Sequence, residues 1–268
     1  MELLAITDSD EELEQHFEEV TVASLEEVAP QIKDGKQDVK ISGELVDKYD
    51  AVFTNIPAKN AVFGRVLLEM IEERGINTDI SSTAFFTASK KNYLYYVLQQ
   101  KNINSPKTIA IASEKATRGI EKHIKGPVIA RRFENLEEVE TKKLGTVESM
   151  HGFAEGVEYE DQFILFHEFS SDDKHRCLKI GDKIISLSEG SESWKFNGEN
   201  LKYSNISKDR EELVRKAANA LGAEVVEVEL RGNEVFDVNP NPDFSVYEDK
   251  SGQDLYGKMV EVLESDTE

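Results

Sequence analysis

The chain is poor in the residues that form covalent cross-links, because its 268 residues include a single cysteine, Cys177. One cysteine excludes an intramolecular disulfide and a zinc site built on cysteines. No apolar run is long enough to cross a bilayer, and the first residues lack the basic flank and cleavage pattern of a signal peptide. We therefore expect a cytoplasmic protein with no membrane segment.

Positive charge is also scarce, with 32 basic residues against 53 acidic ones and a formal net charge of -21. Phosphates would be repelled by such a protein, which argues against nonspecific nucleic-acid binding. The acidic residues are spread along the chain, which is typical of a solvated surface and suggests a halophilic source with a salt-rich cytoplasm. At molar salt the Debye length is about 3 Å, so self-repulsion is largely screened. An acidic mesophilic protein is the alternative, since the lysine count is high for an extreme halophile.

The first eighty-five or so residues alternate between strand and helix patterns, which predicts a small, mostly parallel α/β unit. Apolar runs at 3–7 and 50–54 are typical of buried strands, and 61–73 has helical spacing closed by Gly75. No glycine-rich phosphate loop is found in this unit. The patterns further along predict helices at 89–100, 113–123, 209–221 and 252–263, strands at 109–112, 128–130 and 163–169, and hairpins at 177–187 and 225–243. The charged tract 133–148 fits a mobile excursion or a weak helix.

The hairpin at 225–243 carries the strongest chemical signal. Side chains alternate along a strand, so Glu227 and Glu229 share one face, as do Asp237 and Asn239. If the register joins these faces, Glu229, Asp237 and Asn239 form an all-oxygen cluster of the kind that Mg2+ takes together with substrate phosphates. Prolines on both sides of Asn241 end the second strand just beyond. The alternative is a solvated acidic face on an ordinary hairpin.

The order of motifs from about Ser82 to Tyr247 resembles the ATP-grasp superfamily, and within it the RimK-type ligases that join an amino acid to a carboxylate. The resemblance implies an α/β (α+β) protein, with an ATP-grasp fold of two α+β subdomains behind a small α/β domain. We expect boundaries at 1–86, 87–168 and 169–268. The motifs are Ala88-Ser89-Lys90-Lys91, Ile103-Asn104-Ser105-Pro106-Lys107-Thr108, Pro127-Val128-Ile129-Ala130-Arg131, Phe163 to Phe169, His175-Arg176-Cys177, Trp194-Lys195-Phe196-Asn197 and the hairpin ending in Asn239-Pro240-Asn241-Pro242.

The resemblance also implies roles. The cofactors would be ATP and Mg2+, with Mn2+ as a second candidate, and the partners a small-molecule or peptide carboxylate and an amino acid; homo-oligomer formation is left open. The carboxylate would attack ATP to give an acyl phosphate, from which an amine displaces phosphate. The residues would be Arg176 as the catalytic group, Lys91, Arg131, Glu168, Phe169, Lys195 and Asn197 for ATP, and Glu229, Asp237 and Asn239 for the metal.

The sequence departs from the family pattern at the phosphate loop. No glycine follows Arg131 until Gly145. In addition, Lys90 stands where the family has aspartate, and Asp237 stands where it usually has glutamate. A tight cradle of backbone N–H groups is harder to form without glycine. The alternative interpretation of Arg131 is that it forms surface ion pairs with the glutamates that follow it in the sequence. Two alternative functions stay open: a catalytically reduced relative that binds nucleotide as a regulatory module, and an acidic interaction protein with no nucleotide site.

Overall fold

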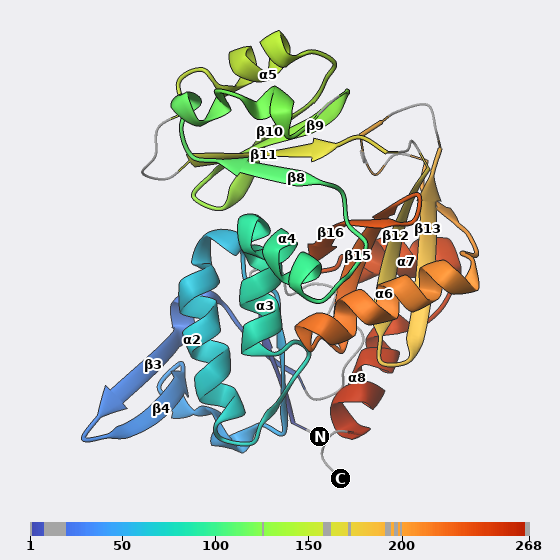
Figure 1. Ribbon diagram of the computed structural model, residues 1–268. Coiled ribbons are helices and arrows are strands. Elements are labelled where there is room, and N and C mark those ends of the chain that lie inside the picture. Colours follow the sequence, from blue (N-terminus) through green and yellow to red (C-terminus); the bar gives the residue numbers. More distant parts are fainter. Residues whose placement is uncertain are drawn as a thin grey trace.

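The computed structural model describes residues 2–7, 20–124, 126–157, 162–170, 173–190, 194–195, 198 and 200–265. Three groups of elements are visible: an N-terminal one with α2 and α3, a central lobe carrying α5, and a C-terminal one with α6 and α8 (Figure 1). The predicted boundaries at 86 and 168 stay a prediction. No helix in the described part of the chain is both long and apolar enough to cross a membrane. The expected helix at residues 9–18 lies outside the described residues.

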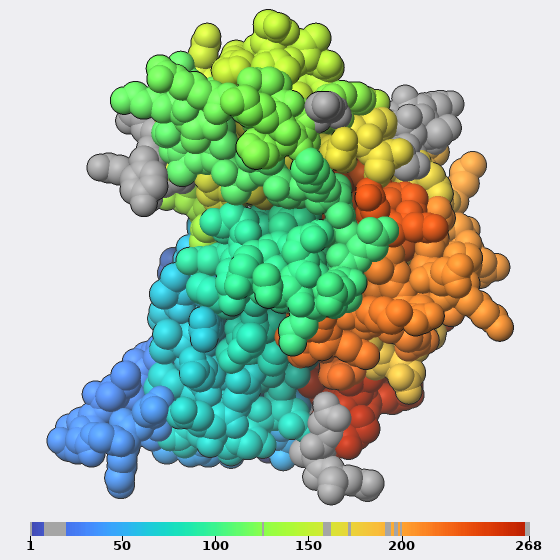
Figure 2. All heavy atoms as spheres, in the orientation of Figure 1, coloured from blue at the N-terminus to red at the C-terminus, as the bar shows by residue number. Residues whose placement is uncertain are grey.

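The N-terminal group contains the predicted parallel sheet, in the order β2-β1-β6-β7. All four residues of β1 are buried, as expected of a central parallel strand covered on both faces. The bounds are β1 Leu3–Ile6, β2 Val20–Ala23, β6 Ala51–Thr54 and β7 Asn77–Thr78. An antiparallel ribbon of β3 Val28–Lys33, β4 Lys36–Ile41 and β5 Glu44–Leu45 was not expected, and its β3–β4 part projects at the lower corner of Figure 2.

The predicted helix at 61–73 is confirmed as α2, Ala61–Glu72, and Gly75 follows it with φ 72°. The predicted helix at 89–100 is confirmed as α4, Lys91–Gln100, and a further helix that was not predicted, α3 Ser82–Ser89, precedes it and meets it at the non-helical Lys90. The helix α3 begins at Ser81, whose hydroxyl accepts a hydrogen bond from Ala84 N at 3.2 Å. The break places Lys91 at the first position of α4.

The central lobe is an antiparallel sheet in the order β10-β9-β11-β8, with α5, Val147–Ala154, beside it. Two expectations were wrong here. The tract 133–148 is largely strand, because Asn135 and Leu136 adopt φ 49° and 69° and turn β9 directly into β10. The span 113–123 holds two short 3-10 turns, separated at Gly119 with φ 82°. The strands are β8 Thr108–Ile111, β9 Val128–Glu134, β10 Glu137–Leu144 and β11 Gln162–Glu168.

The C-terminal group is an antiparallel sheet in the order β14-β13-β12-β15-β16, and both predicted hairpins are confirmed in it. Its core is continuous with the N-terminal sheet, because the rings of Phe53 and Phe244 lie 6.0 Å apart, edge to face. The bounds are β12 Lys174–Ile180, β13 Lys183–Glu189, β14 Lys202–Tyr203, β15 Val225–Arg231, β16 Glu234–Asn239, α6 Lys208–Leu221, α7 Phe244–Ser251 and α8 Leu255–Ser265.

Candidate functional site

The site begins with the register of β15 and β16. Glu229 lies opposite Asp237, and Glu227 opposite Asn239, so the polar faces of the two strands coincide as the sequence predicts. The register shifts just beyond this pair, which adds Phe236 to the same edge of the cleft. A cleft of about 140 Å³ opens here between the central lobe and the C-terminal sheet. It is lined by Ile129, Arg131, Glu138, Thr141, Trp194, Lys195, Glu229, Arg231, Phe236 and Asp237.

Asp237 connects three elements through two cations. Its Oδ1 lies 2.8 Å from Lys91 Nζ on α4, and its Oδ2 accepts a hydrogen bond from Arg131 Nη2 on β9 at 2.6 Å. Burial alone would raise the pKa of Asp237, but the charges of Arg131 and Lys91 outweigh it and lower that pKa to about 2. Lys91 Nζ also donates to Val238 O at 2.7 Å. Both residues predicted to bind phosphate are therefore held by a residue predicted to bind metal.

Arg131 has a second carboxylate partner. Its Nε donates to Glu138 Oε2 at 2.6 Å, and Glu138 lies on β10 across the tight turn. The Arg131 side chain is only 7% exposed, and its guanidinium lies 5.6 Å from the ring centroid of Phe236. Tyr95 is nearby, with its hydroxyl donating to Phe236 O. The expectation that Arg131 pairs with a following glutamate is thus met, although inside the cleft rather than on the surface.

Glu229 differs from its neighbours because its side chain makes no hydrogen bond or ion pair with any of the described residues. Burial, then the charges of Asp237 and Glu227, raise the pKa of Glu229 to about 8. An unpartnered carboxylate facing Asp237 suits a divalent cation, which binds deprotonated carboxylates. No group of three His, Cys, Asp or Glu residues that could hold a metal is found in the described ranges, so two carboxylates are what the chain offers. This is the usual protein share of a Mg2+ site completed by substrate phosphates.

Asn239, the third predicted metal residue, is engaged elsewhere. Its Oδ1 accepts a hydrogen bond from Asn241 N, and its Nδ2 donates to Asn241 O, both at 3.0 Å. These bonds close a turn at the end of β16, where Pro240 and Pro242 prevent further strand pairing. The residue lies on the expected face, with its amide committed to this turn.

Arg176, the predicted catalytic residue, lies on β12 directly opposite Glu229. Its guanidinium nevertheless makes a two-point ion pair with Glu227, from Nη2 to Oε1 at 2.9 Å and from Nε to Oε2 at 3.1 Å. Burial alone would lower the pKa of Arg176, but the attraction of the Glu227 carboxylate is stronger than the effect of burial and raises that pKa. The hydroxyl of Tyr247 donates to the same carboxylate at 2.6 Å.

Of the remaining predicted ATP residues, Glu168 and Phe169 are not among the residues that line the cleft. The amides of Glu168 and Phe169 donate to Lys107 O at 2.9 Å and Pro127 O at 3.0 Å, so both continue the pairing of the central sheet. Lys195 lines the cleft, and its carbonyl accepts from Lys174 Nζ at 2.9 Å. Asn197 lies outside the described residues.

Sequence reasoning missed Tyr95, Glu138 and the role of Glu227. The first two could not be found, because the contacts of Tyr95 with Phe236 and Arg131 depend on how α4 packs against the two sheets, and Glu138 fell in a tract interpreted as a mobile excursion or a weak helix. For Glu227 a signal existed, since its place on the same face as Glu229 follows from strand alternation. His167, which was given no role, is fully buried, and its Nδ1 lies 2.9 Å from Thr108 Oγ1.

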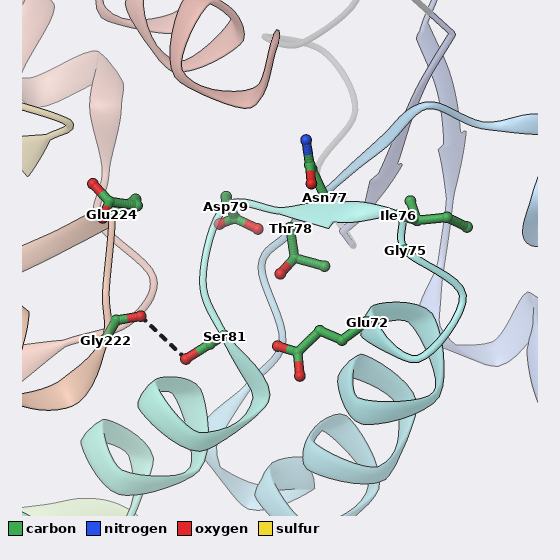
Figure 3. Close-up of a pocket in the computed structure, with 9 residues that line it drawn as sticks. All are labelled: Glu72, Gly75, Ile76, Asn77, Thr78, Asp79, Ser81, Gly222 and Glu224. Carbon is green, nitrogen blue, oxygen red and sulfur yellow. Dashed lines mark hydrogen bonds between the residues drawn. The ribbon is translucent and has the colours of Figure 1, made fainter. Parts of the chain in front are cut away.

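A larger pocket, of about 310 Å³, lies away from this cleft, between α2, β7 and the loop after α6 (Figure 3). Its polar residues mostly serve the fold. Ser81 Oγ donates to Gly222 O at 3.1 Å, and Glu72 accepts from Ser82 N and Oγ at 2.6 and 2.8 Å. The first of these bonds joins the N- and C-terminal groups, and the other two join α2 to α3. We therefore place the functional site at the smaller cleft, where cations and carboxylates face each other.

Asp79 in this larger pocket gives a pH-dependent prediction. Burial raises its pKa to about 8, although its Oδ1 accepts hydrogen bonds from Thr54 N and Oγ1 at 2.9 and 3.1 Å. A raised folded-state pKa means that the stabilisation is full below pH 4 and is lost as the pH rises through 8. Asp79→Asn keeps the acceptor oxygen, so it should flatten the fall in unfolding free energy between pH 4 and 8, which is on the order of a few kcal/mol. Urea denaturation across that range measures it, and an unchanged slope would contradict the assignment.

Glu138 gives a second prediction, because it pairs with Arg131 and would compete with phosphate if Arg131 binds nucleotide as the sequence predicts. Glu138→Gln should raise nucleotide affinity about two- to fivefold, a modest gain since the carboxylate is one-third exposed and screened by solvent. The matched control is Glu137→Gln, whose carboxylate is half exposed and lies 3.9 Å from Lys59. Calorimetric titration with an ATP analogue measures both variants, and a loss of affinity in Glu138→Gln would show that this glutamate supports binding.

The described fold and cleft can now be compared with known proteins. Residues 88–263 match the model of the RimK-like ATP-grasp domain. A probable alpha-L-glutamate ligase of Pectobacterium carotovorum subsp. carotovorum (strain PC1) is 24% identical over 244 residues, covering 86% of this chain and 80% of that protein. The ATP-grasp ligase PsnB, in a complex with precursor peptide PsnA2 and AMPPNP, superposes with a TM-score of 0.73 at 16% identity, covering 99% of this chain and 97% of that one.

A second structure of PsnB, with a minimal precursor, Mg and ADP, gives a TM-score of 0.70 at 16% identity and covers 99% of this chain and 97% of that one. The fold is that of the ATP-grasp ligases, as the motif order predicted. The family match spans well over half of the sequence, so the chain belongs to the RimK-like ATP-grasp family.

Proposed function

We propose that this protein is an ATP-dependent ligase that joins a carboxylate to the amine of an amino acid, using the cleft between the central lobe and the C-terminal sheet. The observation that carries the proposal is that Glu229 lies opposite Asp237, and that Asp237 pairs with two cations, Lys91 and Arg131, at the edge of one cleft. Cations of this kind bind phosphate oxygens, and Glu229 and Asp237 would hold Mg2+. When bound, Mg2+ would offset the charge of the transferring phosphoryl group.

The chain's own residues would act by position and charge. Lys91 and Arg131 would give up their ion pairs with Asp237, bind phosphate oxygens instead and so orient the nucleotide. The substrate carboxylate would then attack the terminal phosphorus, releasing ADP and giving an acyl phosphate. The amine would attack the acyl carbon, forming the amide and releasing phosphate. No nucleophilic side chain is required, since positioning and electrostatics supply the rate enhancement.

The cleft must open before a nucleotide can enter. Its volume of about 140 Å³ is small beside the ~300–1,000 Å³ typical of ligand sites. The Arg131–Asp237 pair joins β9 of the central lobe to β16 of the C-terminal sheet and so holds the cleft closed. We propose that the nucleotide phosphates replace this pair and the lobe moves away from the sheet.

The substrates are proposed from the similar proteins. The relative named as a probable alpha-L-glutamate ligase supports L-glutamate as the amine, and the neighbour in complex with a precursor peptide supports a peptide carboxylate as the acceptor. Phosphate release from Mg-ATP, measured with L-glutamate and a set of carboxylates including peptides, tests this. The proposal expects release only when amine and acceptor are both present.

One observation favours a second candidate, a nucleotide-binding relative without ligase activity. The tight turn at Asn135–Leu136 stands in place of a glycine-rich loop, and Glu138 occupies Arg131. Such a protein would bind Mg-ATP in calorimetry and release no phosphate with any amine and acceptor pair.

A further inference from the structure

The pairing of Arg176 is unexpected from its position. Arg176 lies directly opposite Glu229 in the β12–β15 register, and opposite side chains on one face of an antiparallel pair are close enough to interact. Its guanidinium turns instead to Glu227, two residues along β15, and makes the two-point pair described above. A forked arginine–carboxylate pair fixes the direction of the guanidinium as well as its position.

Glu227 has two features that hold Arg176 in this direction. Its side chain is only 1% exposed, so its charge requires a partner inside the protein. The hydroxyl of Tyr247, which is itself fully buried, donates to Glu227 Oε2 at 2.6 Å and fixes the carboxylate from the side of α7. The result is that the carboxylate of Glu229, which lies directly across from Arg176, makes no ion pair or hydrogen bond with a cation among the described residues.

Resting on the proposed function, we infer that Glu227 is a positioning residue that keeps Glu229 available to the divalent cation. By binding Arg176, it prevents the guanidinium from forming an ion pair with Glu229. If Arg176 turned to Glu229, a positive charge would occupy the ligand that the cation needs, and Asp237, already held by Lys91 and Arg131, would be left as the only carboxylate. Tyr247 supports this by holding Glu227 in place.

The test uses the full chain and measures binding rather than turnover. Calorimetry gives the affinity for AMPPNP with and without Mg2+, and the ratio of the two is the Mg2+ enhancement. Glu227→Gln keeps the shape and an acceptor oxygen but removes the charge, so Arg176 should turn to Glu229. The enhancement should then fall about tenfold while metal-free affinity stays within about twofold. Arg176→Met combined with Glu227→Gln removes the competitor, and should restore the enhancement.

Glu224→Gln is the matched control, because Glu224 precedes the same strand and pairs with Lys179 at 3.1 Å, yet its side chain is 54% exposed. It should leave the enhancement unchanged. Thermal unfolding checks that each variant folds. Should Glu227→Gln fail to fold, Arg176→Met alone carries the test, since the account expects it to keep the enhancement in full.

The outcomes separate this inference from the proposed function. If the wild type shows the Mg2+ enhancement and Glu227→Gln keeps it in full, the positioning role is overturned and the proposed function stands. Failure of the double variant to recover overturns it in the same way, because Glu227 would then act on the metal directly or only through the fold. Absence of any Mg2+ enhancement in the wild type overturns both.

Discussion

Asp237→Asn is expected to lose the Mg2+-dependent part of nucleotide binding while binding metal-free nucleotide at least as well as the wild type. The asparagine keeps the shape but removes the charge that pairs with Lys91 and Arg131 at 2.8 and 2.6 Å. Without Mg2+, phosphate no longer competes with a carboxylate for these cations. With Mg2+, the site has lost one of two carboxylates, and the enhancement should fall about a hundredfold, or ~2.7 kcal/mol.

Calorimetric titration with AMPPNP, with and without Mg2+, measures both effects. Asp182→Asn is the matched control, since Asp182 is fully exposed in the turn between β12 and β13 and lies 3.8 Å from Arg215. An Asp237→Asn protein that keeps the wild-type response to Mg2+ would show that this carboxylate is only a structural partner of the two cations.

Arg131→Met should have the second large effect, on stability and binding together. Arg131 is the partner of both Asp237 and Glu138, and its removal leaves Asp237 with Lys91 alone. Breaking a buried ion pair from one side lowers the unfolding free energy by about 3–5 kcal/mol, and we expect a loss near the lower end because Lys91 still compensates part of the Asp237 charge. Nucleotide affinity should fall as well, since one of two phosphate-binding cations is lost.

Urea denaturation measures the stability change, and Arg132→Met is its control. Arg132 is the next residue along β9, faces away from the cleft, and lies 3.9 Å from Glu140. It should cost only about 1 kcal/mol. Adding Asp237→Asn to Arg131→Met should recover part of the lost stability, since both charges of the pair are then absent. Purely additive losses would argue against the coupling.

The sequence was sufficient to predict the hairpin of β15 and β16, because strand alternation and turn chemistry act over a few residues. Alternation put Glu229 and Asp237 on the polar faces of their strands, but their pairing depended on the register, which the structure supplies. The parallel N-terminal sheet was also predicted, since its two central strands, β1 and β6, are short, mainly apolar runs. In these places local pattern and tertiary structure agree.

The errors fell where the tertiary structure overrides the local pattern. In β10, charged residues alternate irregularly because the strand lies at the sheet edge, so the tract 133–148 gave no clear period. Asn135 and Leu136 both adopt positive φ, which asparagine tolerates and leucine rarely adopts, so the turn was not foreseen. The carboxylates that occupy Arg131 and Arg176 could not be predicted, because each ion pair joins side chains whose approach depends on the packed sheets.

The measurement that tests the account most directly is the affinity of the wild-type protein for an ATP analogue with and without Mg2+. We expect Mg2+ to tighten binding by at least about a hundredfold, the part that Asp237→Asn should lose, because Glu229 and Asp237 would hold the cation together with the nucleotide phosphates. Equal affinities in the two conditions, or no binding in either, would contradict it. The cleft would then be a set of structural ion pairs between the central lobe and the C-terminal sheet.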